Sequence, residues 1–182
     1  MKRSSRSFAI ALSAIACAVA SLALTLGSYV DILFAAGYLI AIFALMVPLS
    51  KQLYWADALA FLGAVLLAFL FCGFAILKLL PFVAFFGLHP LVNALQKRFV
   101  QKKWLHGLCF FGKALWFDGA LLLFWFVVGP LLGLQSTTWY PYVEPYLYYA
   151  VFFGATLLFA AYDYLIFLCQ RSVDRAVARI GR

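Results

Sequence analysis

Residues 120–134, ALLLFWFVVGPLLGL, are apolar apart from glycine and proline, and their hydrophobicity does not alternate along the chain. In a membrane, such a stretch must be a helix or a strand of a closed barrel, because every backbone polar group in a bilayer has to be paired within the protein. A barrel strand would show segments of about ten residues with alternating hydrophobicity. The stretch therefore predicts a membrane helix.

The composition of the whole chain also indicates a membrane protein. Of its 182 residues, 68% are hydrophobic and only 11% are charged, whereas a soluble domain carries about 25% charged residues. A helix needs roughly 20 residues to cross a ~30 Å hydrocarbon core. We expect an all-α bundle of six transmembrane helices that forms one domain over residues 1–182. The expected spans are about 8–27, 30–50, 55–73, 79–97, 105–133 and 146–169.

The basic residues outside the spans lie almost entirely on one side of this layout. They precede the first span or follow the second, fourth and sixth, whereas the opposite loops contain only Lys78. The positive-inside rule then predicts a multi-pass membrane protein with both termini in the cytoplasm. Anionic lipid head groups are the expected counter-charge, and no binding to nucleic acid is expected. The residues on the basic side are Lys2, Arg3, Arg6, Lys51, Lys97, Arg98, Lys102, Lys103, Arg171, Arg175, Arg179 and Arg182.

The beginning of the chain, MKRSSRSFAIALSAIACAVA, has two interpretations. A basic start, an apolar centre and a small-residue end are typical of a cleaved secretory signal. Because the apolar run continues through SLALTLG and is long enough to span, we expect it to remain as the first helix. Its small residues favour close helix packing, either inside the bundle or against a partner protein. They form the small-xxx-small pairs Ala14 with Ala18 and Ala16 with Ala20.

The sequence contains no motif of a familiar enzyme or metal site. The four cysteines show no CxxC spacing, and we expect them to be small buried hydrophobes. There is no GxGxxG, P-loop, HExxH or GxSxG motif, so an ATPase or a familiar hydrolase is not indicated. We therefore expect no metal, no cofactor and no catalytic activity.

The segment FFGLHPLVNALQKRFVQKKW, residues 85–104, changes from apolar to basic around Pro90. Proline removes one backbone hydrogen bond and crowds the carbonyl of Phe86, so the fourth helix should bend or stop there. After the proline, Leu91, Leu95 and Phe99 recur at intervals of four. This pattern fits a helix that turns to lie along the cytoplasmic interface, anchored by its basic residues.

Charged residues inside the fifth and sixth spans predict a buried pair. A charge at the centre of an isolated membrane helix costs on the order of 2.5–3.5 kcal/mol, so such residues usually face the bundle and find partners. At 1.5 Å per residue, His89, Lys113 and Asp163 lie at roughly 12, 13 and 10 Å from the cytoplasmic ends of their spans. We expect Lys113 to pair with Asp163 and His89 to lie at the same level. The cluster either pins helices four, five and six together or relays protons or substrate.

The loop before the sixth span, LQSTTWYPYVEPYLYYAVFFG, is rich in aromatic residues and includes Trp139, Tyr140 and Glu144. Tyrosine and tryptophan concentrate at membrane interfaces without any ligand. The same side chains, stiffened by Pro141 and Pro145, would also make a lid over a planar or apolar ligand. Both interpretations remain open at this point.

The layout resembles that of the substrate-binding S components of energy-coupling factor (ECF) transporters. The shared features are six spans in about 180 residues, cytoplasmic termini, the alanine-rich AIACAVA in the first helix and the aromatic loop between the last two. The segments FFGLHPLVNAL, GKALWFDGAL and YDYLIF also look like segments of small six-helix membrane proteins from Gram-positive anaerobes that have this layout. The second resemblance implies this layout in a bacterial cell membrane and does not indicate which activity to expect.

The S-component resemblance implies a membrane subunit that binds a vitamin-like or other small molecule in an outward-facing pocket. Its first helix would dock a transmembrane coupling subunit driven by separate ATPases, and Ala14, Ala16, Ala18 and Ala20 match that docking motif. No vitamin-specific signature matches. The substrate-binding candidates by position are Tyr29, Asp31, Lys78, Trp139, Tyr140 and Glu144.

Two other classes of function remain open. The first is a small membrane enzyme that acts on a lipid through the His89, Lys113 and Asp163 cluster, although no nucleophile or metal motif supports it. The second is a non-catalytic partner subunit in the membrane.

Overall fold

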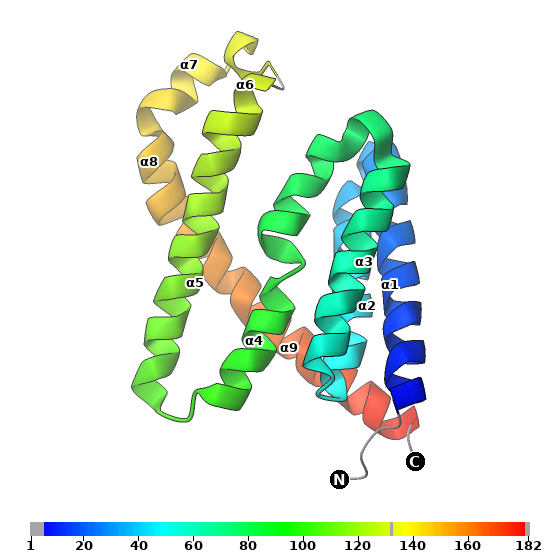
Figure 1. Cartoon of the computed structure of the whole chain (residues 1–182). Coiled ribbons are helices and arrows are strands. Elements are labelled where there is room, and N and C mark those ends of the chain that lie inside the picture. The colour runs from blue at the N-terminus through cyan, green and yellow to red at the C-terminus, as the bar shows by residue number, and fades with distance from the viewer. Residues whose placement is uncertain (1–5, 132, 181–182) are drawn as a thin grey trace. The chain divides into compact units, whose positions relative to one another are not determined.

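The computed structural model describes residues 6–131 and 133–180, and these contain helices and turns but no strand (Figure 1). Within these residues, six stretches are long and apolar enough to cross a membrane, so the chain is a multi-pass membrane protein and the prediction of six spans is confirmed at that level. The side of the membrane on which the termini lie stays a prediction. The candidate spans are Arg6–Tyr29, Asp31–Ser50, Tyr54–Cys72, Leu77–Phe99, Trp104–Leu131 and Tyr140–Arg179.

The sixth candidate span is longer than the sequence predicted. It begins at Tyr140, because the aromatic segment expected to be a loop forms short helical turns that lead into the last long helix. Pro141 and Pro145 each lie in the first turn of one of these short helices, where the missing backbone N–H of proline costs nothing.

The chain divides into two compact units. Unit 1 consists of Met1–Phe99 and Ile166–Arg182, and unit 2 consists of Val100–Leu165. The boundary at residue 165 falls inside one continuous helix, α9. In unit 1 and the boundary helix, the elements are α1 (Arg6–Tyr29), η1 (Asp31–Leu33), α2 (Phe34–Ser50), α3 (Tyr54–Cys72), η2 (Gly73–Leu79), η3 (Phe82–Phe86), α4 (His89–Phe99) and α9 (Thr156–Ile180). In unit 2 they are α5 (Lys103–Leu123), η4 (Phe124–Val128), α6 (Gly129–Leu131), η5 (Leu134–Ser136), α7 (Tyr140–Val143), η6 (Glu144–Tyr146), α8 (Leu147–Tyr149) and η7 (Ala150–Ala155).

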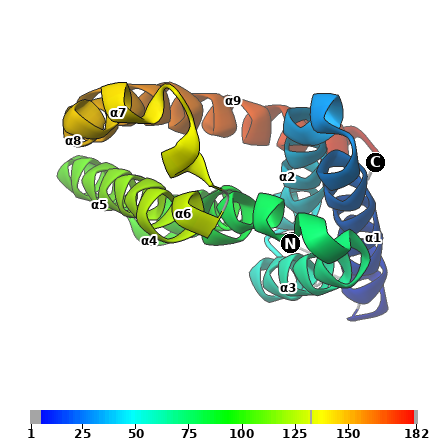
Figure 2. The ribbon, with the colours of Figure 1, turned by 90° about the horizontal axis from the view of Figure 1, so that it is seen from above.

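Small residues bring α1, α2 and α3 together in unit 1, where Figure 2 shows them side by side. A Cβ atom at Gly37 of α2 would lie 2.5 Å from the carbonyl oxygen of Ala23 and 3.1 Å from the Cα of Gly27. The backbones of α1 and α2 therefore approach more closely than any side chain at Gly37 would allow. This is the usual route to association in lipid, where apolar surface gives little drive between helices. Ala20, Ala41, Ala64 and Ala68 are fully buried.

The alanine pairs of α1 divide between an inner and an outer face. Ala16 and Ala20 are buried, whereas Ala14 and Ala18 are exposed. Of the two alternatives expected for these small residues, Ala16 and Ala20 follow the first and pack inside the chain. The reason is helical geometry: positions 16 and 20 share a face with Ala23, Leu24 and Gly27, which packs within unit 1.

The fourth span is interrupted where the sequence predicted a bend. Gly87 and Leu88 form a turn between η3 and α4, and Pro90 is the second residue of α4. The proline thus lies in the first turn, where its missing N–H has no helical partner to lose. The absence of a side chain at Gly87 lets the ring of Phe61 pack against this turn, because a Cβ atom there would lie 2.5 Å from that ring.

Unit 2 is built on α5 and the helical segments that return beside it (Figure 1). The ring of Phe159, in the first part of α9, is fully buried and stacks on two rings of α5. Its ring centroid lies 5.5 Å from that of Phe110 and 5.4 Å from that of Phe117. These contacts fix the register in which polar residues of α5 and α9 meet.

Candidate functional site

Three of the predicted substrate-binding residues lie at the end of unit 1 where α1 leads into α2. Lys78 Nζ is 2.5 Å from Asp31 Oδ1 and also donates to the carbonyl oxygen of Ser28 at 3.2 Å. The side chains of Lys78 and Asp31 are 41% and 88% exposed, so the pair contributes about 0–1 kcal/mol to stability. The hydroxyl of Tyr29 donates to the carbonyl oxygen of Phe71. The charges of Lys78 and Asp31 neutralise each other, so neither is left free to pair with a charged ligand.

The other three predicted residues lie in unit 2. The ring of Tyr140 stacks on Trp125 with centroids 5.3 Å apart and planes 13° apart, and Trp139 contacts the same indole at 6.1 Å. The hydroxyl of Tyr140 donates to Glu144 Oε1 at 3.2 Å. Trp125 was not among the predicted residues, since its position in the apolar stretch gave no sign of this role. Because the six residues are divided between two units, the outward-facing pocket assigned to them stays a prediction.

The buried charges of unit 2 form the pair that the sequence predicted. Lys113 Nζ of α5 donates to Asp163 Oδ1 of α9 at 2.6 Å, and the two side chains are only 5% and 10% exposed. A second polar contact joins the same helices, where Thr156 Oγ1 donates to Asp118 Oδ2 at 2.9 Å. Charge-assisted hydrogen bonds of this length are strong, and neither charge can be left alone in lipid without a large penalty.

His89 belongs to unit 1, so its expected place at the level of Lys113 and Asp163 stays a prediction. It is the first residue of α4 and is completely buried. Its ring lies against Phe85, with centroids 5.0 Å apart. The break before α4 therefore places a polar ring among aromatic side chains.

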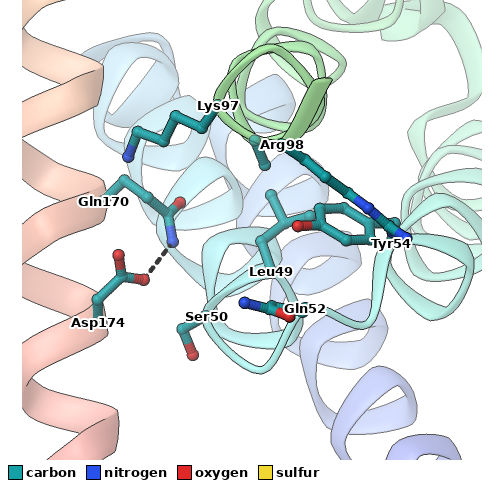
Figure 3. Close-up of a pocket in the computed structure, with 9 residues that line it drawn as sticks. Leu49, Ser50, Gln52, Tyr54, Lys97, Arg98, Gln170 and Asp174 are labelled. Carbon is teal, nitrogen blue, oxygen red and sulfur yellow. Dashed lines mark hydrogen bonds between the residues drawn. The ribbon is translucent and has the colours of Figure 1, made fainter. Parts of the chain in front are cut away.

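A cavity of about 490 Å³ lies at the other end of unit 1 from Asp31 and Lys78, where α2 ends and α3 begins (Figure 3). The last turns of α4 and the C-terminal part of α9 complete its wall. Sequence reasoning missed this cavity, because it interpreted the basic residues after the fourth span only as a topology signal. The lining residues are Leu49, Ser50, Gln52, Tyr54, Ala94, Lys97, Arg98, Gln170 and Asp174.

Two cations of α4 line the cavity, and each is supported by an aromatic ring. Lys97 Nζ lies 5.1 Å from the ring centroid of Phe167, and the guanidinium of Arg98 lies 5.1 Å from that of Tyr54. Such contacts stabilise a cation without using its N–H donors. Among the described residues, neither Lys97 nor Arg98 has a carboxylate within ion-pair distance. Their donors are therefore available to an anion.

The acceptors of the cavity lie on α9. Gln170 is buried, and its Nε2 donates to Asp174 Oδ1 at 2.8 Å and to the carbonyl oxygen of Met46 at 3.4 Å. Because both partners accept, the amide nitrogen must face them and Oε1 faces away from Asp174 (Figure 3). Oε1 is buried and has no donor among the described residues. The glutamine thus holds Asp174 at the edge of the cavity.

Comparison with known proteins gives no assignment: no family model matches the chain, and neither do curated proteins or solved structures. Within the described part of the chain, no group of three or more histidine, cysteine or acidic side chains is placed to hold a metal ion.

Proposed function

We propose that the chain is a non-catalytic membrane protein that binds a small polar molecule in the cavity at the basic end of unit 1. The observation that carries the proposal is the cavity itself, with cations from α4 and acceptors from α9 around one space. Its volume of about 490 Å³ lies in the range of about 300–1,000 Å³ that is usual for small-molecule sites.

The way in which the chain builds this space supports a binding site. Its lining comes from four separate stretches of sequence: the end of α2, the turn before α3, α4 and the last part of α9. Lys97 and Arg98 have no carboxylate within ion-pair distance among the described residues, so an anion in the cavity could accept hydrogen bonds from both.

A separate proposal, in which the ligand would bind in an outward-facing pocket and not in this cavity, is that the chain is the substrate-binding subunit of an ECF-type uptake transporter. It is supported by the resemblance in layout and by the exposure of Ala14 and Ala18 on α1, which leaves a small-residue surface for a coupling subunit. This proposal predicts that the chain co-purifies with a transmembrane coupling subunit and ATPases when they are expressed together.

The buried polar pairs of unit 2 favour a second candidate function. Ionisable residues inside membrane spans often mark proton or ion pathways. Lys113 with Asp163, and Asp118 with Thr156, would give α5 and α9 two places at which a proton could be held. In this candidate, binding is coupled to movement of a proton.

Native mass spectrometry of the purified chain tests the main proposal. We expect a small molecule to co-purify with the wild-type protein and to be absent from Ala94→Trp, because the indole would fill the cavity that Ala94 lines. Ala36→Trp is the matched control, since Ala36 is an exposed residue of α2 that does not line the cavity. If Ala94→Trp retains the molecule as well as the control does, the cavity is not its site.

A further inference from the structure

We infer that the ligand of this cavity is a phospholipid head group that carries an ammonium beyond its phosphate, of the ethanolamine type. The inference rests on the proposed function and names the chemistry of the bound molecule. Its basis is the set of charges that line the cavity, with two cations on α4 and a carboxylate on α9.

The two cations of α4 favour an anionic ligand whose oxygens can accept hydrogen bonds from two sides. Figure 3 shows Lys97 extending toward α9 and Arg98 extending over Tyr54, so the two side chains flank the cavity. A phosphodiester has two anionic oxygens and accepts hydrogen bonds from both sides. Arginine matches phosphate through its planar fork of donors, and lysine binds it as a point charge.

The acceptors on α9 favour a ligand that carries a positively charged hydrogen-bond donor in addition to its anionic group. Asp174 lies one helical turn after Gln170, which holds Asp174 Oδ1 through its amide nitrogen. Asp174 attracts Lys97 and Arg171 repels it, so the charge next to α9 is mixed. An ammonium has N–H donors for the carboxylate of Asp174, whereas the quaternary ammonium of choline has none.

The place of the cavity favours a lipid over a soluble ligand. It lies at the ends of candidate spans, between Ser50 at the end of α2 and Tyr54 at the start of α3. Head groups lie at this depth, and the cavity wall also includes the apolar side chains of Leu49 and Ala94. The positive-inside rule predicts that this end faces the cytoplasm, so we expect the lipid to come from the cytoplasmic leaflet.

The test is a set of lipid titrations of the full chain in mild detergent, read by native mass spectrometry. Phosphatidylethanolamine, phosphatidylcholine and phosphatidylglycerol with identical acyl chains are compared, together with soluble phosphoethanolamine. We expect phosphatidylethanolamine to bind about tenfold or more tightly than each of the other three, because only it presents a phosphate, N–H donors and an acyl anchor together. This comparison uses the wild-type protein and does not depend on any variant.

Two substitutions separate the parts of the site. Asp174→Asn keeps an acceptor for Gln170 but loses the charge, so the preference for ethanolamine over choline should fall about tenfold while binding of phosphatidylglycerol does not weaken. Lys97→Gln with Arg98→Gln should weaken all three lipids. Arg179→Gln is the control, since it removes one charge from the same end of α9 without lining the cavity.

The outcomes distinguish the inference from the function on which it rests. Equal binding of the ethanolamine and choline lipids, or of the ethanolamine and glycerol lipids, overturns the ammonium part and with it the inference. Equal binding of soluble phosphoethanolamine overturns the lipid source. If another co-purifying molecule occupies the cavity and no phospholipid competes with it, the inference fails and the proposed function stands. If the purified chain carries no molecule that Ala94→Trp removes, the proposed function fails too.

Discussion

In unit 1, α1 and α2 meet through glycine and alanine, whereas in unit 2, α5 and α9 are joined by buried polar side chains. At Gly37 the close approach leaves no room for a Cβ atom. At Lys113 and Asp163 the contact is a hydrogen bond of 2.6 Å between two charges. Because lipid is as apolar as the helix surfaces, either close packing or polar pairing must supply the association. Close packing depends on the shape of the two helix surfaces, whereas polar pairing depends on the presence of both partners.

The largest effect on stability should come from removing one partner of the charge pair in unit 2. Lys113→Met or Asp163→Leu alone should lower the free energy of unfolding by about 3–5 kcal/mol, because each leaves one buried charge without its partner. The double variant should be close to the wild type or more stable. Thermal unfolding in detergent, followed by size-exclusion chromatography, measures all three. A double variant as unstable as either single one would show that the pair does not hold α5 and α9 together.

The next effect should come from Gly37→Ala in unit 1. The new methyl group would lie 2.5 Å from the carbonyl oxygen of Ala23, so α1 and α2 must move apart at a cost of about 1–3 kcal/mol. Gly112→Ala in α5 is the control, because a Cβ atom there meets no atom within 4 Å. The same unfolding assay applies. If the two alanine variants unfold at the same temperature, shape does not govern the contact of α1 with α2.

A smaller effect is expected at the second polar contact of unit 2. Thr156→Val removes the hydroxyl that donates to Asp118 Oδ2, and polar contacts between membrane helices contribute about 0.6 kcal/mol on average. Thr156→Ser keeps the hydroxyl and should restore most of this loss. Equal stability of the valine and serine variants would assign the contact no part in the association.

The smallest effect on stability should come from the outer face of α1. Ala18→Leu should leave unfolding almost unchanged, since Ala18 is exposed, whereas Ala16→Leu should destabilise unit 1 by about 1–3 kcal/mol because Ala16 is buried. Co-purification with a coupling subunit then tests the docking role separately. If Ala18→Leu unfolds the protein, that face is packed inside the chain. If it folds and still binds the subunit, the face does not dock it.

The sequence predicted the helices better than the sites. Run length and the cost of unpaired backbone groups in lipid are local properties, so the six spans and the break near Pro90 could be predicted from them. The pair of Lys113 and Asp163 followed from the cost of lone charges at similar depth. The spans and the break depend on one helix at a time. The charge pair depends only on two helices and on the depth of each residue in the membrane.

The cavity could not be predicted in this way, because it depends on which residues of distant segments meet. Lys97 and Arg98 looked like part of a basic cluster, and Gln170 and Asp174 like the polar end of the last span. Only the packing of α4 and α9 against the turn before α3 brings them around one space. For the same reason the sequence left open whether Ala16 and Ala20 pack inside the chain or against a partner, since a stripe of small residues does not say which surface covers it.

The most direct test of the central claim is whether the two cations of the cavity hold the bound molecule. Wild-type protein, Lys97→Gln with Arg98→Gln, and the Arg179→Gln control are purified side by side, and the molecule carried by each is measured by native mass spectrometry. We predict that the wild type and the control carry it in equal amounts and that the double variant, folded by its chromatographic profile, loses at least about nine-tenths of it. Retention of the molecule by a folded double variant would contradict the assignment of this cavity as the binding site.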